Sequence, residues 1–327
     1  MIGSAVLAMV TVVIGLIGLW WCGDRVVQYT VEVAESLGIT TFFIGFIILA
    51  IAADIPEIAV ALMAAFKGVN GISAGNLIGG NFVDVAVVVG ATLFFSRSSL
   101  LIPAHDRFKL VRMLMLTALV LVLLICIGSI GKVLGAVLVA VYIASLVWVW
   151  KKKVSHHDVM YQEVVAVQEE VKEHKSVFLT SRMGLIVKLG ASFGGVLCAS
   201  SLTVNSALEL STMLAWPVEA IGATLLALGT SLPEFAISFN SLRRGQHSLA
   251  IGPTLGTVLE QSTLILGILA LASSQPVYLG GLVGSVIFSL LAFAILCYAL
   301  IRYERIGRGT GTALGLLLVA YIFYYLW

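Results

Sequence analysis

Long apolar stretches alternate with short polar ones along most of the chain. A helix that crosses a bilayer needs about 20 mostly apolar residues, and ten stretches meet this length. They cover residues 3–22, 41–66, 72–96, 110–128, 131–150, 184–208, 217–242, 249–273, 277–301 and 309–327. The pattern therefore predicts an all-α polytopic membrane protein of ten transmembrane helices whose main partner is the lipid bilayer.

One long hydrophilic segment, residues 151–182, interrupts this pattern. It mixes lysines and glutamates and contains the pair His156 and His157. A metal-sensing or regulatory role for the two histidines is one interpretation, but a solvated connector explains the mixed charges better. We therefore expect three parts: a first five-helix repeat over 1–150, a linker over 151–182 and a second five-helix repeat over 183–327.

The composition supports a membrane protein and excludes several other classes. Of the 327 residues 60% are hydrophobic and 11% are charged, whereas soluble domains carry about 25% charged residues. The net charge of +2 provides no basic face for a nucleic acid. The four cysteines are far apart in or beside apolar segments, which indicates packing residues rather than a disulfide framework. The apolar run Ala5–Trp21 lacks a preceding basic residue, so we interpret it as a retained span rather than a cleaved signal peptide.

The basic residues lie almost entirely on one side of the predicted membrane. Sixteen of the 19 fall in alternate loops, whereas Lys67 and Lys132 fall in the others and Lys188 lies within the sixth span. Since Lys and Arg accumulate on the cytoplasmic side, the linker is predicted to be cytoplasmic and both termini to be outside, in the cell membrane.

The two halves of the chain contain an internal repeat. The segments Ala50-Ile-Ala-Ala-Asp-Ile-Pro-Glu57 and Ala227-Leu-Gly-Thr-Ser-Leu-Pro-Glu234 are 177 positions apart, and the same offset aligns glycines 75, 79 and 90 with glycines 252, 256 and 267. Each half has an odd number of spans, so the second half must enter the membrane from the opposite face. Inverted repeats of this kind are common in secondary transporters, with the binding site between them near the midplane.

Five acidic residues lie near the middle of four predicted spans that contain no Lys or Arg. They are Asp54, Glu57, Asp84, Glu234 and Glu260. An ionised acid at the bilayer centre costs several kcal/mol or more, so these groups are either protonated and hydrogen-bonded or arranged to bind cations. Their repetition at matching depth favours cation binding.

Oxygen ligands suited to a hard cation accompany these acids. Pro56 and Pro233 each precede a glutamate, and a proline removes a backbone donor from the preceding turn. We therefore expect free carbonyl oxygens around Ala50–Ala53 and Ala227–Thr230. Neutral side-chain oxygens are available from Asn81, Thr230, Ser231 and Gln261. Carboxylates, carbonyls and amides are typical ligands of Ca²⁺, and these spans offer no His or Cys for a softer metal.

The segment Gly229-Thr-Ser-Leu-Pro-Glu234 resembles the α-repeat signature of the cation/Ca²⁺ antiporter superfamily. Gly75-Asn-Leu-Ile-Gly-Gly-Asn-Phe-Val-Asp84 resembles the companion motif of the first repeat. The resemblance, which is greatest to prokaryotic Na⁺/Ca²⁺ exchangers, implies that Glu57 and Glu234 bind Ca²⁺. It also implies contributions from these residues: Thr230, Ser231, Asp84, Gln261 and the backbone carbonyls of Ala50 and Ala227.

This chain departs from the superfamily pattern at several positions. Ala53 and Asp54 stand where Thr and Ser are usual, and Gln261 is neutral where Asp is common. Thr257 and Glu260 fall in an altered motif, and Glu260 is about 100° round the helix from Gln261. Whether Glu260 faces the site and whether Na⁺ or H⁺ is the coupling ion are therefore left open by the sequence.

The sequence as a whole predicts a secondary antiporter that exchanges Ca²⁺ for Na⁺ by alternating access. It predicts no enzymatic activity, no organic cofactor and no obligatory protein partner. An antiporter of Ca²⁺ or another divalent cation with H⁺ is the first alternative, because the additional acid Asp54 could carry protons. A cation channel is more remote. An intramembrane acid hydrolase using Asp54 and Asp84 ranks last, because it does not explain the repeated Pro-Glu pairs.

Overall fold

The computed structural model describes residues 2–36, 54–96, 99–151, 182–243 and 250–326. These residues are almost entirely helical. Seven of their helices are long and apolar enough to cross a membrane, and Lys132–Val147 forms a shorter apolar helix. The prediction of an all-α polytopic membrane fold is confirmed.

The described part of the first half contains six helical segments and two short strands. The helices are α1 (Ile2–Ser36), α4 (Ile55–Lys67), α5 (Asn70–Val83), α6 (Gly90–Phe95), α7 (Ala104–Ile127) and α8 (Lys132–Lys151). A π-helix, η2 (Asp84–Val89), joins α5 to α6 without a break. The strands are β1 (Leu100–Leu101) and β2 (Ser129–Ile130).

The second half follows the same order with more interruptions. Its helices are α10 (Arg182–Leu214), α11 (Val218–Ile221), α12 (Ala227–Thr230), α13 (Leu232–Arg243), α14 (Gly252–Glu260), α15 (Leu266–Ala272), α16 (Val283–Arg302) and α17 (Arg308–Leu326). The π-helices η3 (Gly222–Leu226) and η4 (Gln261–Ile265) and the 3₁₀ turn η5 (Gly280–Leu282) lie between them. The strands are β3 (Val277–Tyr278) and β4 (Arg305–Ile306).

Several of the predicted spans differ from the observed helices. The first helix continues to Ser36 instead of ending at residue 22, because Asp24 and Arg25 end the apolar window without ending the helix. The fourth begins at Ala104 rather than residue 110. The seventh span is broken at Ser231. Of the second span only Ile55–Lys67 and the preceding Asp54 are described. The proposed linker between the halves lies outside the described residues, apart from its two ends.

The internal repeat extends through the whole described chain. The π-helices η2 and η4 begin 177 positions apart, at Asp84 and Gln261. Strand β1 pairs with β4 and strand β3 pairs with β2, with Leu100 opposite Ile306 and Val277 opposite Ile130. Equivalent elements thus make equivalent contacts, as expected for two copies of one fold related by inversion.

The last helix of each half packs on the third span of the other half. Helix α8 packs on α15, and α17 packs on α6. A Cβ atom built on Gly135 of α8 would lie 3.0 Å from the Gly267 carbonyl oxygen, and one on Gly311 of α17 would lie 2.7 Å from that of Gly90. These glycines allow the backbones to approach closely, which is how helices commonly associate in membranes. The two halves are therefore interlocked.

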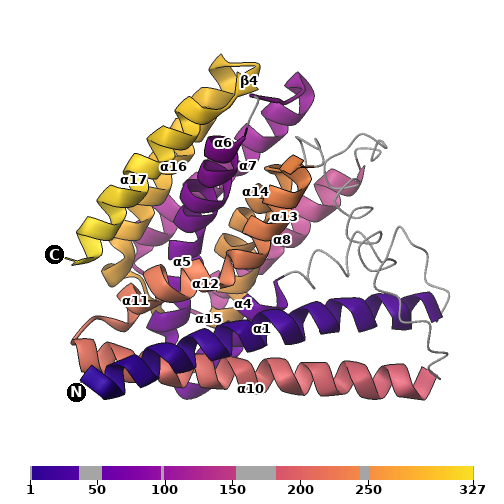
Figure 1. The fold of residues 1–327 in the computed structure, drawn as a ribbon, viewed down its shortest axis with the longest axis vertical. Helices are drawn as coiled ribbons and strands as arrows, with labels where there is room; N and C mark the ends of the chain where they lie inside the picture. The colour runs from indigo at the N-terminus through magenta and orange to yellow at the C-terminus, as the bar shows by residue number, and fades with distance from the viewer. Residues whose placement is uncertain (1, 37–53, 97–98, 152–181, 244–249, 327) are drawn as a thin grey trace.

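Helices α1 and α10 form a separate long pair. They lie side by side along the base of the view in Figure 1, run in opposite directions and cross the axes of the other helices. A Cβ atom on Gly18 would lie 3.2 Å from that of Ala199, and one on Gly195 would lie 2.6 Å from the Cys22 sulfur. The two contacts are related by the 177-residue offset, so the inversion axis passes between these helices. The four cysteines are free, but only Cys297 is a buried packing residue, whereas Cys126 and Cys198 are exposed.

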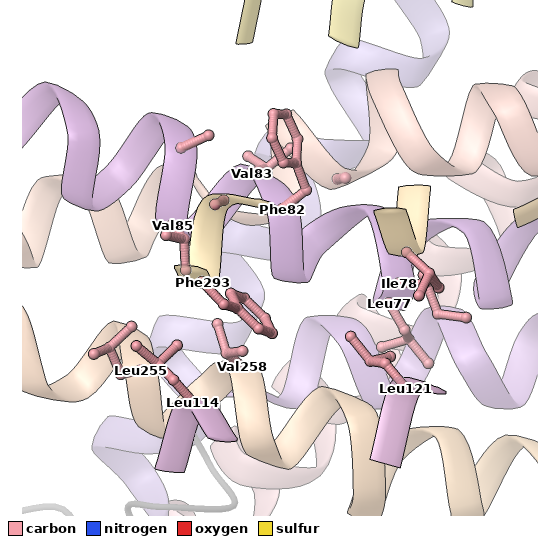
Figure 2. Packing of buried hydrophobic residues seen from close by; sticks show 14 of the residues in the cluster. Leu77, Ile78, Phe82, Val83, Val85, Leu114, Leu121, Leu255, Val258 and Phe293 are labelled. Carbon is pink, nitrogen blue, oxygen red and sulfur yellow. The ribbon is translucent and has the colours of Figure 1, made fainter. Parts of the chain in front are cut away.

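The main apolar core is shared between the two halves. Figure 2 shows Phe82 and Val85 of the first half in the same cluster as Leu255, Val258 and Phe293 of the second. The stretches α5–η2–α6 and α14–η4–α15 are the most deeply buried of the candidate spans. The polar residues that these two stretches carry are consequently held at the centre of the protein.

Candidate cation-binding site

Two repeat-related helices begin at the centre of the protein. Helix α4 starts directly after Asp54, with Pro56 in its first two positions and Glu57 in its first turn. Helix α13 starts directly after Ser231 and carries Glu234 in its first turn. The N-terminus of a helix has a partial positive charge and stabilises nearby carboxylates. Both Pro-Glu pairs therefore occupy equivalent positions.

The carbonyl of Ala227, which the sequence predicts to be free, has a hydrogen-bond donor in the structure. It accepts the backbone N–H of Ser231 at 3.1 Å. Pro233 does not free this oxygen, contrary to the expectation, because a proline removes the donor from the carbonyl four residues before it, that of Gly229, whereas Ala227 is reached by Ser231. The Thr230 hydroxyl lies 3.5 Å from the same oxygen, so both lone pairs of the carbonyl face donors.

A hydrogen-bonded network joins the two halves at Asp84. The Ser231 hydroxyl donates to Asp84 Oδ1 at 2.5 Å, and the Gln261 amide donates to Asp84 Oδ2 at 3.2 Å. Asp84 and Gln261 are equivalent positions of the repeat and are bonded directly to each other. The pseudo-symmetry axis of the fold therefore passes close to this contact.

Two further hydrogen bonds link the same helices. The Thr230 hydroxyl donates to Asn76 Oδ1 at 3.2 Å, and the Asn81 amide donates to Ser262 Oγ at 2.7 Å. All four residues are buried. Thr230 also lies beside the Glu57 carboxyl group. Neutral oxygen and nitrogen groups from both halves thus surround the acids.

Five carboxyl groups gather in this region. Asp84 is 0% exposed, Asp54 1%, Glu57 2% and Glu260 6%, whereas Glu234 is partly exposed. Asp54 has Glu260, Glu57 and Glu234 as electrostatic neighbours, and Glu234 also has Asp84. The helices that carry the five acids have basic residues only at their far ends, Lys67 and Arg243. Their negative charge must therefore be balanced by protons or by bound cations.

Many oxygen atoms of this region are buried without a hydrogen-bond partner. They are both carboxyl oxygens of Asp54, Oε2 of Glu57, Oε2 of Glu234, Oε1 of Glu260, Oδ1 of Asn81 and Oε1 of Gln261. A buried polar atom without a partner normally costs about 1–3 kcal/mol. All seven atoms are potential acceptors, which is the arrangement that a cation would stabilise.

Glu260 lies within the cluster. Its carboxyl group is beside that of Asp54 and the hydroxyl of Tyr142 on α8. The side chain therefore faces Asp54 and also has Glu57 as an electrostatic neighbour. Glu260 and Asp54 form a pair of adjacent acids next to the Glu57 and Glu234 positions.

The number of carboxyl ligands available to one ion is limited. Within the described parts of the chain, no three His, Cys, Asp or Glu side chains lie close enough together to hold a single metal ion. A cation bound here would therefore use at most two carboxyl groups and complete its shell with neutral oxygens, as Ca²⁺ sites commonly do.

The structure brings most of the predicted site residues together. Thr257 of α14 is partly buried but has no described polar contact with the other site residues, and Ala50 and Ala53 lie outside the described residues. Sequence reasoning missed Asn76, Ser262 and Tyr142. Asn76 follows Gly75 within the recognised motif, which could have indicated it, whereas no local pattern distinguishes Ser262 or Tyr142.

Known proteins resemble this chain over most of its length. CaxA of Alkalimonas amylolytica, which is named as an antiporter, is 29% identical over 80% of this chain and 79% of its own. The sodium/calcium exchanger MaX1 of Methanosarcina acetivorans is 25% identical over 78% and 80%. Among solved structures, a sodium-calcium exchanger, NCX_Mj, soaked with Na⁺ and Ca²⁺ has a TM-score of 0.58 at 22% identity and covers 97% of each chain, so it shares the fold.

The family model described as sodium/calcium exchanger protein matches residues 7–151 and 184–327, which together make up nearly the whole chain. The two matched segments correspond to the two halves of the repeat. Two of the relatives are named as transport proteins, in agreement with the prediction that the chain is not an enzyme. This chain therefore belongs to the sodium/calcium exchanger protein family, within the cation/Ca²⁺ antiporter superfamily that its motifs resemble.

Proposed function

We propose that the protein exchanges Ca²⁺ for Na⁺ across the membrane by alternating access at the central carboxyl cluster. The observation that carries this proposal is the set of buried oxygens without donors in Asp54, Glu57, Glu234, Asn81 and Gln261. Hard cations bind such oxygens, whereas a purely structural network would provide each acceptor with a donor.

Glu57 and Glu234 are the proposed carboxylate ligands of Ca²⁺. They are equivalent in the repeat, lie in the first turns of α4 and α13, and together balance a double positive charge. Thr230, Ser231 and Gln261 would complete the shell from the opposite side, together with the Ala227 carbonyl once the Thr230 hydroxyl turns away from it. Asp84, which accepts hydrogen bonds from Ser231 and Gln261, would orient both side chains. In the same proposal Ala50 mirrors Ala227, and Asn81, Thr257, Glu260 and Ala53 are more peripheral.

The inverted repeat supports alternating access. Two halves of the same fold and opposite orientation can adopt each other's conformations, which opens the site to one side of the membrane and then to the other. Na⁺ also prefers oxygen ligands and would compete for the same atoms. The names of MaX1 and NCX_Mj, which mention sodium and calcium, agree with this choice of ions.

The adjacent acids Asp54 and Glu260 favour a second candidate, exchange of Ca²⁺ or another divalent cation for H⁺. Two buried carboxyl groups side by side repel each other when both are ionised and are accommodated when they share one proton. Proton release from this pair would then accompany cation entry. Replacement of Asp54 by Ser, the residue usual in the superfamily at this position, would remove proton dependence while retaining Ca²⁺ transport.

Transport by the purified protein in liposomes tests both candidates. A Na⁺ gradient imposed at clamped pH should drive Ca²⁺ movement if Na⁺ is the coupling ion, and a pH gradient without Na⁺ should drive it if H⁺ is. Glu57→Gln and Glu234→Gln should abolish uptake, whereas Glu209→Gln on the exposed face of α10 should not. Uptake that survives both site variants would refute the site, and flux that needs no counter-ion would indicate a channel.

The same proposal includes the location of the protein. The protein would lie in the cell membrane with both termini outside and residues 151–182 in the cytoplasm, an orientation that the distribution of basic residues supports. Ca²⁺ and Na⁺ are substrates, and the proposal requires no organic cofactor and no protein partner.

A further inference from the structure

A buried tyrosine that does not belong to the cation cluster contacts the helical segment leading to two residues of that cluster. Tyr321 of α17 is 2% exposed, and its hydroxyl donates a hydrogen bond of 2.8 Å to the carbonyl of Ala223. Ala223 belongs to the π-helix η3, which leads directly into α12 and so to Thr230 and Ser231. Helix α17 is the last helix of the chain and carries no residue of the proposed site.

The hydroxyl of Tyr321 is the last member of an oriented chain of donors. Ser285 Oγ lies 3.1 Å from the Tyr321 hydroxyl and 2.5 Å from the Tyr325 hydroxyl. A phenol has one proton to donate, and that of Tyr321 is directed to Ala223. Ser285 must therefore donate to Tyr321, and Tyr325 must donate to Ser285. All three hydroxyl protons are directed toward η3.

The other side of η3 is held by α5. A Cβ atom built on Gly79 would lie 2.8 Å from the carbonyl carbon of Ala223, so the two backbones are in direct contact. The Tyr321 ring also packs on Phe82 of α5, with 4.2 Å between ring centroids. Tyr321 thus contacts η3, which leads to Ser231, and α5, which leads to Asp84.

We propose that Tyr321 is a positioning residue of the cation site, whose hydroxyl fixes η3 against α5 and so keeps Ser231 within reach of Asp84. This inference rests on the proposed function, because it assigns Tyr321 a role in cation binding. A π-helix is a distorted turn that depends on surrounding contacts. Loss of the hydroxyl leaves the Ala223 carbonyl without this donor and lets the segment shift.

Transport kinetics of Tyr321→Phe test the inference in the full-length protein in liposomes. We expect the KM for Ca²⁺ to rise about fivefold with Vmax per folded protein within a factor of two. Fivefold corresponds to about 1 kcal/mol, the usual net contribution of one hydrogen bond. Tyr324→Phe is the matched control, because Tyr324 lies on the same helix, is 55% exposed and packs on Phe288 rather than η3.

A second variant and a second measurement keep the test decisive. Ser285→Ala retains the bond to Ala223 but removes the donor to Tyr321, and should raise KM about twofold, a smaller effect than that of one direct hydrogen bond. Hydrogen exchange, which does not depend on the transported ion, should be faster for the amides of η3 and α12 in Tyr321→Phe than in Tyr324→Phe.

The outcomes separate the positioning role from the proposed function. Wild-type protein that takes up no Ca²⁺ refutes the proposed function, and the exchange rates of η3 then decide on Tyr321 by themselves. Uptake by the wild type with an unchanged KM in Tyr321→Phe overturns the positioning role. A lower yield of folded Tyr321→Phe with an unchanged KM would show that the tyrosine serves only folding, and an equal rise of KM in Tyr324→Phe would overturn the inference as well.

Discussion

Replacement of Gly79 by Ala tests whether the close approach of the two halves positions the cation site. Gly79 of α5 faces the backbone of Ala223 in η3, and a Cβ atom at this position would lie 2.8 Å from the Ala223 carbonyl carbon and 2.5 Å from its oxygen. Both neighbours are backbone atoms in helical segments, so neither can rotate away as a side chain would.

The size of the effect follows from these distances. An ordinary Cβ contact begins at 3.4 Å, and the Ala223 Cα lies even closer to the added atom than these two atoms do. The segments must therefore separate by at least about 0.9 Å, the difference between 3.4 Å and the distance to the carbonyl oxygen. The bond between Ser231 Oγ and Asp84 Oδ1, now 2.5 Å, would approach or pass the limit of about 3.0 Å for two oxygens. Overpacking of this kind costs about 1–3 kcal/mol.

Two assays on the purified variant measure the consequences. We expect the apparent Tm in detergent to fall by about 5 °C, given the usual dependence of Tm on stability, and the KM for Ca²⁺ to rise in the same preparation. Gly194→Ala in α10 is the control, because no atom lies within 4 Å of its added Cβ and alanine favours a helix. If Gly79→Ala and Gly194→Ala give the same Tm and the same KM, the close contact does not position the site.

Three further predictions concern the site, the long helix pair and the topology. Ser231→Ala removes the short bond to Asp84 and should raise the KM for Ca²⁺ about tenfold, since hydrogen bonds to charged groups contribute about 1.5–3 kcal/mol; an unchanged KM in uptake assays would exclude Ser231 from the site. In a protein otherwise free of cysteine, Gly18→Cys and Ala199→Cys should form a disulfide on mild oxidation, because their Cβ positions are 3.2 Å apart, close to the usual disulfide range. Gel mobility detects the bond, and its absence would contradict the antiparallel pairing of α1 and α10. Cysteine in place of Lys132 should react with an impermeant maleimide on intact cells, whereas cysteine in place of Arg305 should react only after permeabilisation, and the reverse result would invert the proposed orientation.

The residues of the site were largely predictable because the alignment of the two repeats identifies equivalent positions in each half. Asp84 and Gln261 could be paired from the 177-residue offset alone, and the structure places them in a direct hydrogen bond. A repeated acid in an apolar span is also a strong signal, since burial of a charge is costly unless it has a function.

The contacts between helices were not predictable from one sequence. The position of Tyr321 in the last span does not show which helix its hydroxyl meets, because that depends on how α17 crosses the other half. The C-terminal end of α1 was misplaced and the break at Ser231 was missed for a related reason. Apolar windows report where the bilayer is crossed, whereas helix ends depend on capping and local hydrogen bonds.

The exchange of last helices between the halves has a consequence for how the protein is assembled. Helix α6 is covered by α17 and α15 is covered by α8, so the first half leaves the ribosome with the glycine face of α6 uncovered until the final helix is made. Each half therefore covers its own central span only in part. A cut in the chain between the halves leaves these contacts available, so two co-expressed fragments should reassemble, while either fragment alone should be degraded. An ancestral single-repeat protein with this packing would have been an obligate pair of oppositely inserted subunits.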